Sequence, residues 1–173
     1  MSPARHFTFW WLSLILLLSV TALGRVATGQ QVGGDARHPN DRSDAVARTM
    51  QVAQRAFDHF RRGLATGQWQ PFLDMLSDDF TFYFPTGKYQ GLHVGKAKAA
   101  EFFHYVASVF TEGVQITEVL RVTADEKTVV FEFRDEGKLH GQMYKNRVAV
   151  SLDVCGDKIC GYREYFGSDG KSN

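Results

Sequence analysis

The sequence predicts an α+β domain in which one curved sheet folds over a layer of helices. In the first half of the chain, apolar residues recur at steps of three and four, which is the period of an amphipathic helix. In the last third, β-branched and aromatic runs alternate with short turn segments, which is typical of an antiparallel meander. The chain has 173 residues, of which 44% are hydrophobic, so it can bury a substantial core.

Three helices are predicted before the meander. The first spans residues 43–67, with Ser43 or Asp44 as its cap. Its apolar stripe consists of Val46, Met50, Ala53, Phe57, Phe60 and Leu64. The second helix covers residues 69–76, and the third covers residues 97–110. All three place apolar side chains on one side, so we expect them to pack against the sheet.

The strands are predicted from alternation. A short strand covers residues 80–84, where phenylalanines alternate with Thr81 and Tyr83, and Pro85 ends it. The four strands of the meander are predicted at residues 115–123, 128–134, 144–155 and 159–166. The segment 88–95 between the short strand and the third helix is expected to be a loop.

Residues 1–24 resemble a secretory signal peptide. A basic head, Met1–His6, precedes the uncharged apolar run Phe7–Leu23, and small residues follow where a peptidase would cleave, after Gly24 or Gly29. The alternative is a membrane anchor that is not cleaved. In both cases we expect the folded domain to lie outside the cytoplasm, either secreted or periplasmic, or anchored to the membrane and facing outward.

The rest of the chain divides into three parts. Residues 25–42 are polar and lack apolar periodicity, which predicts a disordered linker. Residues 43–168 form the domain, and residues 169–173 form a short tail.

Composition and motifs exclude several function classes. The net charge is +1, and the domain has no large Lys/Arg cluster, which argues against nucleic acid as a partner. No glycine-rich phosphate loop, CxxC pair, HExxH or GxSxG motif occurs. His93, His104 and His140 are scattered over a loop, a helix and a turn, so no metal site and no cofactor is predicted.

The order of elements, together with three segments, resembles the SnoaL-like branch of the nuclear-transport-factor-2-like superfamily. The segments are GQWQPFLDMLSDDFTFYFP, GLHVGKAKAAEFF and DKICGYREYFG. The resemblance implies a cone-shaped fold whose curved four-strand sheet encloses an apolar pocket, commonly in a homodimer that packs sheet against sheet. It also implies that part of the phenylalanine-rich core, including Phe82, Phe84 and Phe103, is a wall for a small hydrophobic or aromatic molecule.

The family's known catalytic sets are incomplete in this chain. The positions of the ketosteroid isomerase groups read as Phe60, Phe84 and Ala149, none of which can move a proton. Glu164 matches the water-binding acid of the limonene-epoxide hydrolases in position and charge, and Glu132 with Arg134 resembles their acid and arginine strand. Fold alone therefore does not decide the function.

The alternation of side chains along the predicted strands indicates which residues could form the site. Tyr162 and Glu164 share a face of the last strand, and we place them beside the apolar face of the preceding strand, which carries Asn146. Glu132 and Arg134 share one face of their strand, and the sequence does not decide whether that face lines the pocket. If it does, Glu132 and Glu164 are two carboxyls in an aromatic cavity, with Arg134 beside them as a further candidate catalytic residue.

Cys155 and Cys160 flank a four-residue turn, and in an exported protein we expect them to form a disulfide worth about 2 kcal/mol. Two free thiols are the alternative. Direct pairing of the two cysteines would turn Tyr162 and Glu164 away from the Asn146 face unless a bulge shifts the register by one residue.

Three functions remain open at this point. The first is cofactor-free acid/base catalysis at Glu164 on a small hydrophobic molecule, of the cyclase, isomerase, dehydratase or hydrolase kind. The second is a non-catalytic ligand carrier with the same pocket. The third is a dimeric interaction domain that uses the convex side of the sheet.

Overall fold

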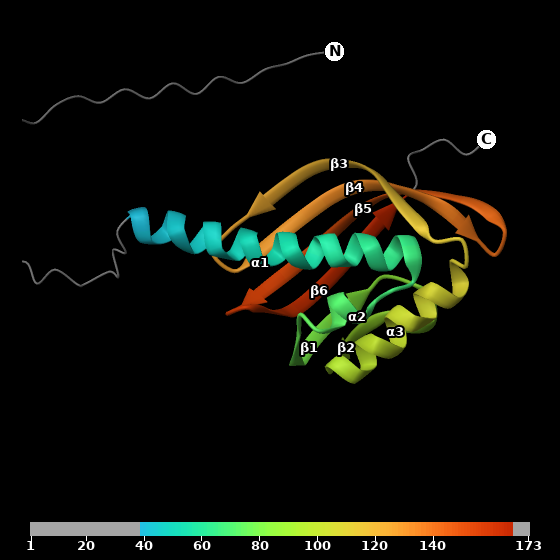
Figure 1. The fold of residues 1–173 in the computed structure, drawn as a ribbon, viewed down its shortest axis with the longest axis horizontal. Coiled ribbons are helices and arrows are strands. Elements are labelled where there is room, and N and C mark those ends of the chain that lie inside the picture. The colour runs from blue at the N-terminus through green and yellow to red at the C-terminus, as the bar shows by residue number, and fades with distance from the viewer. Residues whose placement is uncertain (1–38, 168–173) are drawn as a thin grey trace, which may run out of the picture. The chain divides into compact units, whose positions relative to one another are not determined.

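The computed structural model describes residues 39–167, and Figure 1 shows how their helices and strands are arranged. The predicted signal peptide or anchor, residues 1–24, lies outside the described residues. So do the predicted linker up to residue 38 and the predicted tail, 169–173.

The described helices are α1 (Pro39–Thr66), α2 (Gln70–Leu73), the 3₁₀ turn η1 (Gly87–Tyr89) and α3 (Lys96–Val109). Helix α1 begins four residues earlier than predicted, because Pro39 suits a first helical turn and Ser43 bonds back to the carbonyl of Asn40 instead of capping. Helix α2 is a single turn, since Leu76 already belongs to the sheet. Within residues 39–167, no helix is long and apolar enough to cross a bilayer.

The strands form one six-stranded mixed sheet. They are β1 (Leu76–Phe84), β2 (Gly91–Val94), β3 (Val114–Ala124), β4 (Thr128–Leu139), β5 (Gln142–Cys155) and β6 (Lys158–Gly167). Their order in the sheet is β2-β1-β6-β5-β4-β3, with β1 parallel to β6 and the other neighbours antiparallel.

The α+β class and the meander β3 to β6 are confirmed, but the prediction of one isolated short strand was incomplete. β1 pairs with β6, and part of the predicted loop is the edge strand β2. The turn between β4 and β5 is also shorter than predicted, since only His140 and Gly141 separate the two strands. The polar residues that indicated a long turn lie on exposed strand positions, where Glu136 pairs with Lys145 at 2.6 Å.

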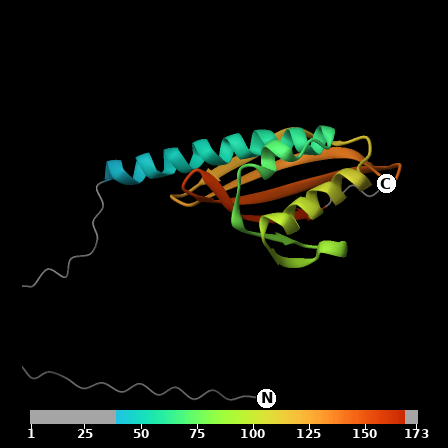
Figure 2. The same cartoon turned by 60° about the horizontal axis from the view of Figure 1, so that its bottom comes forward.

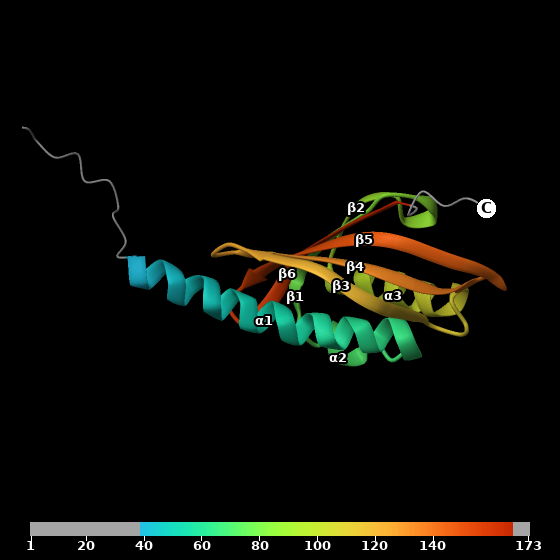
Figure 3. The same cartoon turned by 90° about the horizontal axis from the view of Figure 1, so that it is seen from above.

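All three helices lie on one face of the sheet, which Figures 2 and 3 show from two further sides. Helix α1 buries Ala53, Phe57 and Phe60 of the predicted stripe, together with Ala56, which was not part of the prediction. The ring of Phe57 stacks on Phe131 of β4 with ring centroids 4.1 Å apart. This helical layer and the concave face of the sheet build both the core and the walls of a cavity.

Candidate functional site

A cavity of about 310 Å³ lies between the helices and the concave face of the sheet. Most of its wall is aromatic: Phe60, Trp69, Phe84, Tyr89, Phe102, Phe103, Tyr105, Phe110, Phe133, Tyr144, Tyr162 and Phe166. Polar groups are few, and two of them are the carboxyl groups of Asp135 and Glu164. Such a wall is suited to a small apolar molecule that carries one or two polar groups.

A bulge in β6 turns Glu164 into this cavity. Val154 pairs with Ile159, but Asp153 pairs with Gly161, so Cys160 is an extra residue on β6. Beyond the bulge, Glu164 faces the same side as the buried Val150 of β5. The bulge thereby reconciles the disulfide with a pocket-facing Glu164.

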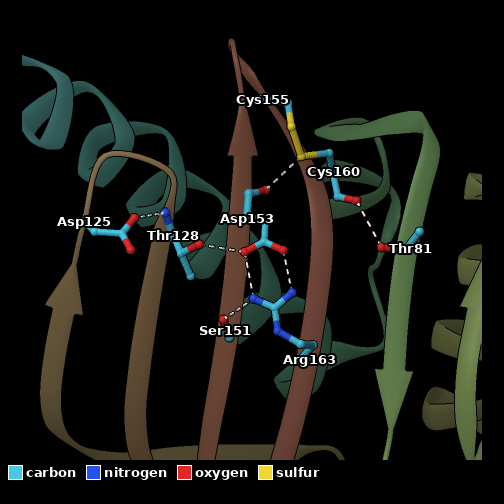
Figure 4. Close-up of polar contacts among 8 residues, drawn as sticks. All are labelled: Thr81, Asp125, Thr128, Ser151, Asp153, Cys155, Cys160 and Arg163. Atoms are coloured by element: carbon cyan, nitrogen blue, oxygen red, sulfur yellow. Dashed lines mark hydrogen bonds and ion pairs between the residues drawn. A yellow bond between two sulfur atoms is a disulfide. The ribbon is translucent and has the colours of Figure 1, made fainter. Parts of the chain in front are cut away.

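The bulge is held from two sides, as Figure 4 shows. Cys155 and Cys160 form the expected disulfide, with their Cα atoms 5.8 Å apart. On the convex face, the Arg163 guanidinium donates to both carboxylate oxygens of Asp153, at 2.5 and 2.7 Å, and to the Ser151 hydroxyl at 2.9 Å. This forked pairing ties β6 to β5 directly after the extra residue.

Glu164 is paired with a tyrosine of its own strand. The hydroxyl of Tyr162, which is 1% exposed, donates a hydrogen bond to Glu164 Oε2. Burial is the main cause that raises the pKa of Glu164 to about 7; the Tyr162 hydrogen bond opposes this rise, and the charge of Asp135 adds to it. At neutral pH this carboxyl is therefore present in both its protonated and its ionised form.

Asp135 of β4 is the second carboxyl of the cavity, and the sequence analysis did not single it out. The residue is only 7% exposed, and within residues 39–167 its buried Oδ1 has no hydrogen-bond partner. Burial raises the pKa of Asp135 to about 7, although the backbone N–H of Asn146 lowers it in part. The signal that could have found it is alternation, because Asp135 follows Phe131 and Phe133 on the same face.

Tyr144 of β5 brings a second hydroxyl to the acid pair. The side-chain amide of Asn146 donates to the Tyr144 hydroxyl oxygen at 2.8 Å. Burial raises the pKa of Tyr144, and the charges of Asp135 and Glu164 raise it further. The phenol therefore stays protonated at neutral pH.

Together these groups can exchange protons with a ligand. Since burial raises the pKa of each carboxyl to about 7, each can take up or release a proton near neutral pH. One carboxyl can then act as a base while the other acts as an acid. Within residues 39–167, no group of three or more His, Cys, Asp or Glu side chains is arranged to hold a metal ion.

The structure brings several of the predicted residues together. Glu164, Tyr162, Phe84 and Phe103 line the cavity. Asn146 contributes through its bond to Tyr144 instead of lining the wall.

Phe82 lies behind the wall instead of on it. It is fully buried, and its ring stacks on His93 of β2 and on Phe102 of α3. The Nε2 atom of His93 lies 3.0 Å from the carbonyl oxygen of Tyr89. Phe82 therefore supports the cavity wall from behind and, contrary to the prediction, does not line the cavity.

Glu132 and Arg134 lie on the opposite face of the sheet, and the possibility that they line the pocket is wrong. Because Phe133 between them points into the core, its two neighbours must point outward. Glu132 lies 3.9 Å from Arg121, and Arg134 donates to Glu118 at 2.6 Å. Asp135 takes the place that Glu132 was expected to fill beside Glu164.

The comparison with protein families agrees with this architecture. Residues 53–162 match the family described as SnoaL-like domain. The chain belongs to the SnoaL-like family. The match covers the cavity-facing part of α1 and every element from α2 to the bulge in β6.

Solved structures include several that are similar to this SnoaL-like chain. An NTF2-like protein from Anabaena variabilis ATCC 29413 is 60% identical, with a TM-score of 0.70 over 81% of this chain and 100% of that one. A provisionally assigned polyketide cyclase from Xanthomonas campestris pv. campestris is 21% identical, with a TM-score of 0.60 over 71% and 93% of the two chains. A provisionally assigned isomerase from Rhodopseudomonas palustris is 16% identical, with a TM-score of 0.56 over 68% and 90%.

At the two lower identities the likeness concerns the fold alone. No curated protein matches this SnoaL-like chain. The chemistry must therefore be argued from the cavity itself.

Proposed function

We propose that this SnoaL-like domain binds a small, largely apolar molecule and moves one of its protons by acid/base chemistry. The reaction is of the cyclase, isomerase, dehydratase or hydrolase kind and uses side chains alone. The observation that carries the proposal is that Glu164 and Asp135 share one aromatic cavity. General acids and bases work best when their pKa lies near the working pH, and both carboxyls are shifted in that direction.

Glu164 is the base in this proposal. Tyr162 occupies its Oε2, and the described residues provide no hydrogen bond to its Oε1, which leaves that oxygen for the ligand. Asp135 has a buried oxygen without a hydrogen-bond partner among the described residues, so its protonated form is favoured. Proton transfer to an ionised Glu164 then moves the negative charge from this carboxylate onto the ligand, beside a protonated Asp135.

The test uses 1-tetralone, a bicyclic ketone small enough for the cavity, and follows exchange of its α-protons for deuterium by NMR. We expect wild type to accelerate the exchange at pH 7 and Glu164→Gln to abolish it, with ligand affinity near wild type and the variant at least as stable as wild type. Glu132→Gln is the matched control, because it makes the same chemical change on the convex face.

The outcomes separate the alternatives. Equal loss of exchange in Glu132→Gln and Glu164→Gln contradicts the assignment of Glu164. Binding of 1-tetralone by wild type without any faster exchange favours a non-catalytic carrier.

We also propose that the domain works outside the cytoplasm. The disulfide between Cys155 and Cys160 supports this location, since disulfides persist in oxidising compartments. Mass spectrometry of the native protein from fractionated cells should find it in the envelope or the medium, cleaved after Gly24 or Gly29. Its mass should be lower by two hydrogens than that of the form with two free thiols. Recovery from the cytosol with two free thiols would contradict the proposal.

We further propose a homodimer that covers the convex side of the sheet near β2. Leu92 and Val94 are 68% and 66% exposed there, and the neighbouring rings of Tyr83 and Tyr165 lie 5.8 Å apart. Exposed apolar groups of this kind are common at protein interfaces. Native mass spectrometry should show a dimer that Leu92→Ser with Val94→Ser dissociates; a monomeric wild type would contradict the proposal.

A further inference from the structure

The mouth of the cavity is marked by those lining residues that are exposed to solvent. They come from η1 and the residue before it, from α3 and from the β4–β5 turn: Thr86, Gly87, Lys88, Tyr105 and His140. Two of these five residues have a basic side chain, and none has an acidic one. The acids of the cavity, Asp135 and Glu164, belong to β4 and β6 and are not exposed. The cavity therefore has carboxyl groups inside and basic groups at its mouth.

Two aromatic rings hold the ammonium group of Lys88 at this mouth. Its Nζ lies 5.3 Å from the ring centroid of Tyr89 and 5.2 Å from that of Tyr105. A cation at such a distance from an aromatic face is attracted to it. The Glu101 carboxylate is also within reach of the Lys88 charge, but it is paired with Lys98 at 2.6 Å. Within residues 39–167, Lys88 forms no ion pair, so its charge can serve a ligand.

His140 reaches the mouth from a backbone conformation that few side chains adopt. Only His140 and Gly141 connect β4 with β5, and their φ angles are 51° and 80°. Two-residue turns of this kind favour Asn or Asp followed by Gly, because these residues tolerate the left-handed conformation. Strained backbone positions concentrate at functional sites. The turn itself does not need an imidazole, whereas an imidazole N–H can donate to a ligand in either protonation state.

A carboxylate is the ligand group that matches this mouth. Lys88 and His140 both supply N–H donors, and a carboxylate accepts hydrogen bonds on each of its two oxygens. Deeper in the cavity the same group would meet Asp135 and Glu164, which are negative when ionised. It would also lose its hydration against aromatic walls. A ligand with one charged end is therefore expected to bind with its apolar part inward and its charge at the mouth.

We propose that the ligand is a small aromatic carboxylic acid, whose carboxylate is held at the cavity mouth by Lys88 and His140 while its ring system fills the cavity. This ligand class rests on the proposed function and narrows it. Lys88 and His140 are binding residues in this arrangement. They fix which part of the molecule lies inside, beside Asp135 and Glu164, and they exchange no proton with it.

The test compares 2-naphthoate with 2-naphthamide, which has nearly the same shape but no charge. Calorimetric titration of wild type at pH 7 and low ionic strength should show that 2-naphthoate binds about fivefold more tightly. Lys88→Gln should weaken 2-naphthoate about threefold and leave 2-naphthamide unchanged, since an exposed ion pair contributes on this scale. In wild type, salt at roughly 0.5 M should reduce the preference for 2-naphthoate in the same way, because it screens exposed charges.

Lys127→Gln is the matched control for Lys88→Gln. It removes the same charge from the exposed turn between β3 and β4, at a residue that does not line the cavity. We expect it to leave both affinities unchanged. Equal weakening of 2-naphthoate by the two substitutions would show that net charge acts instead of a contact, and would overturn the assignment of Lys88.

His140→Asn tests the second binding residue without disturbing the turn, because Asn tolerates the left-handed conformation. We expect it to weaken 2-naphthoate about threefold, to leave 2-naphthamide unchanged and to leave the protein at least as stable as wild type. A purely structural role for His140 would change the stability without changing the preference for 2-naphthoate, and that result would remove His140 from the proposed site.

Nuclear Overhauser contacts report the orientation of bound 2-naphthoate. The ring protons farthest from the carboxylate should contact the buried Phe103, and those beside the carboxylate should contact the exposed Tyr105. The reverse orientation overturns the proposal, and so does a wild type that binds 2-naphthoate no better than 2-naphthamide. If 1-tetralone still shows exchange that depends on Glu164, only the carboxylate site at the mouth is removed. If none of the three molecules binds, the proposed function fails with it.

Discussion

At the scale of single residues, the site depends on carboxyl groups held where water is scarce. Glu164 reaches the cavity from β6 and Asp135 from β4, and burial is the main cause of the raised pKa of each. A buried carboxylate is costly, so the protonated form is favoured over a wider pH range than in water. The same property that suits these groups to proton transfer makes them a cost to stability at high pH.

This cost predicts how stability depends on pH. The raised pKa of Glu164 means that the folded state holds this proton more tightly than the unfolded chain. The contribution of this bound proton to the free energy of unfolding is fully present below about pH 4.5 and is lost as the pH rises through about 7. Glu164→Gln removes the penalty, so its free energy of unfolding, relative to wild type, should rise on the order of 2 kcal/mol over that range.

Urea unfolding at several pH values measures this difference. Glu132→Gln should show no such trend, because Glu132 lies on the convex face. A Glu164→Gln difference that does not change with pH would show that Glu164 is solvated.

At the scale of elements, close backbone packing sets the geometry. Gly161 follows the bulge in β6, and a Cβ there would lie 2.4 Å from Asp153 Oδ2. Only glycine lets Asp153 keep its paired arrangement with Arg163 across β5 and β6. The register that points Glu164 inward therefore depends on a residue with no side chain.

Where α1 packs against the residue before α2, we predict that a Gly→Ala substitution lowers the free energy of unfolding, although this substitution usually raises it in a helix. In a helix interior, Gly→Ala normally stabilises by about 1 kcal/mol. At Gly63 the added methyl group would lie 2.3 to 2.7 Å from ring atoms of Trp69, which is 2% exposed and cannot easily move. We expect Gly63→Ala to destabilise by about 1–3 kcal/mol.

Chemical unfolding measures this change, with the exposed Gln51→Ala on the same helix as the control, expected to be near neutral. The Trp69 fluorescence should also shift in Gly63→Ala. Stabilisation by Gly63→Ala would show that the ring moves away without loss of packing.

At the scale of the whole molecule, the cavity interrupts an otherwise close-packed core. Its walls come from α1, β1, η1, α3, β3, β4, β5 and β6, so a ligand in the cavity would contact elements from most of the described domain. Filling the cavity should therefore stabilise the fold as a unit and not one element.

Ligand binding should raise the free energy of unfolding by about 2.7 kcal/mol when 1-tetralone is present at about 100 times its Kd. Val106→Phe, which fills part of the cavity from α3, should abolish this stabilisation while the unliganded protein remains folded. Equal stabilisation of wild type and Val106→Phe would place the ligand outside the cavity. Thermal and urea unfolding with and without the ketone measure the effect.

Much of the fold was predictable because its signals are local. The stripe of α1 and the alternation in β4, β5 and β6 can be read from neighbouring residues. Strand β2 was missed because its four residues include a glycine and a histidine and lie in a segment that reads as a loop. Glu164, Tyr162 and the disulfide were predicted, whereas Asp135 and Tyr144 were not, since alternation indicates the apolar face of a strand but not where along that face the core leaves a cavity.

The sequence by itself determined the α+β class, the long first helix and the meander, because spacing along the chain is enough to specify them. Only the tertiary structure decided that Asp135 instead of Glu132 stands beside Glu164, and that Glu164 faces inward despite the disulfide. The physical reason is that a shift of one residue exchanges the two faces of a strand. The extra residue at Cys160 makes that shift, and its position depends on contacts between strands.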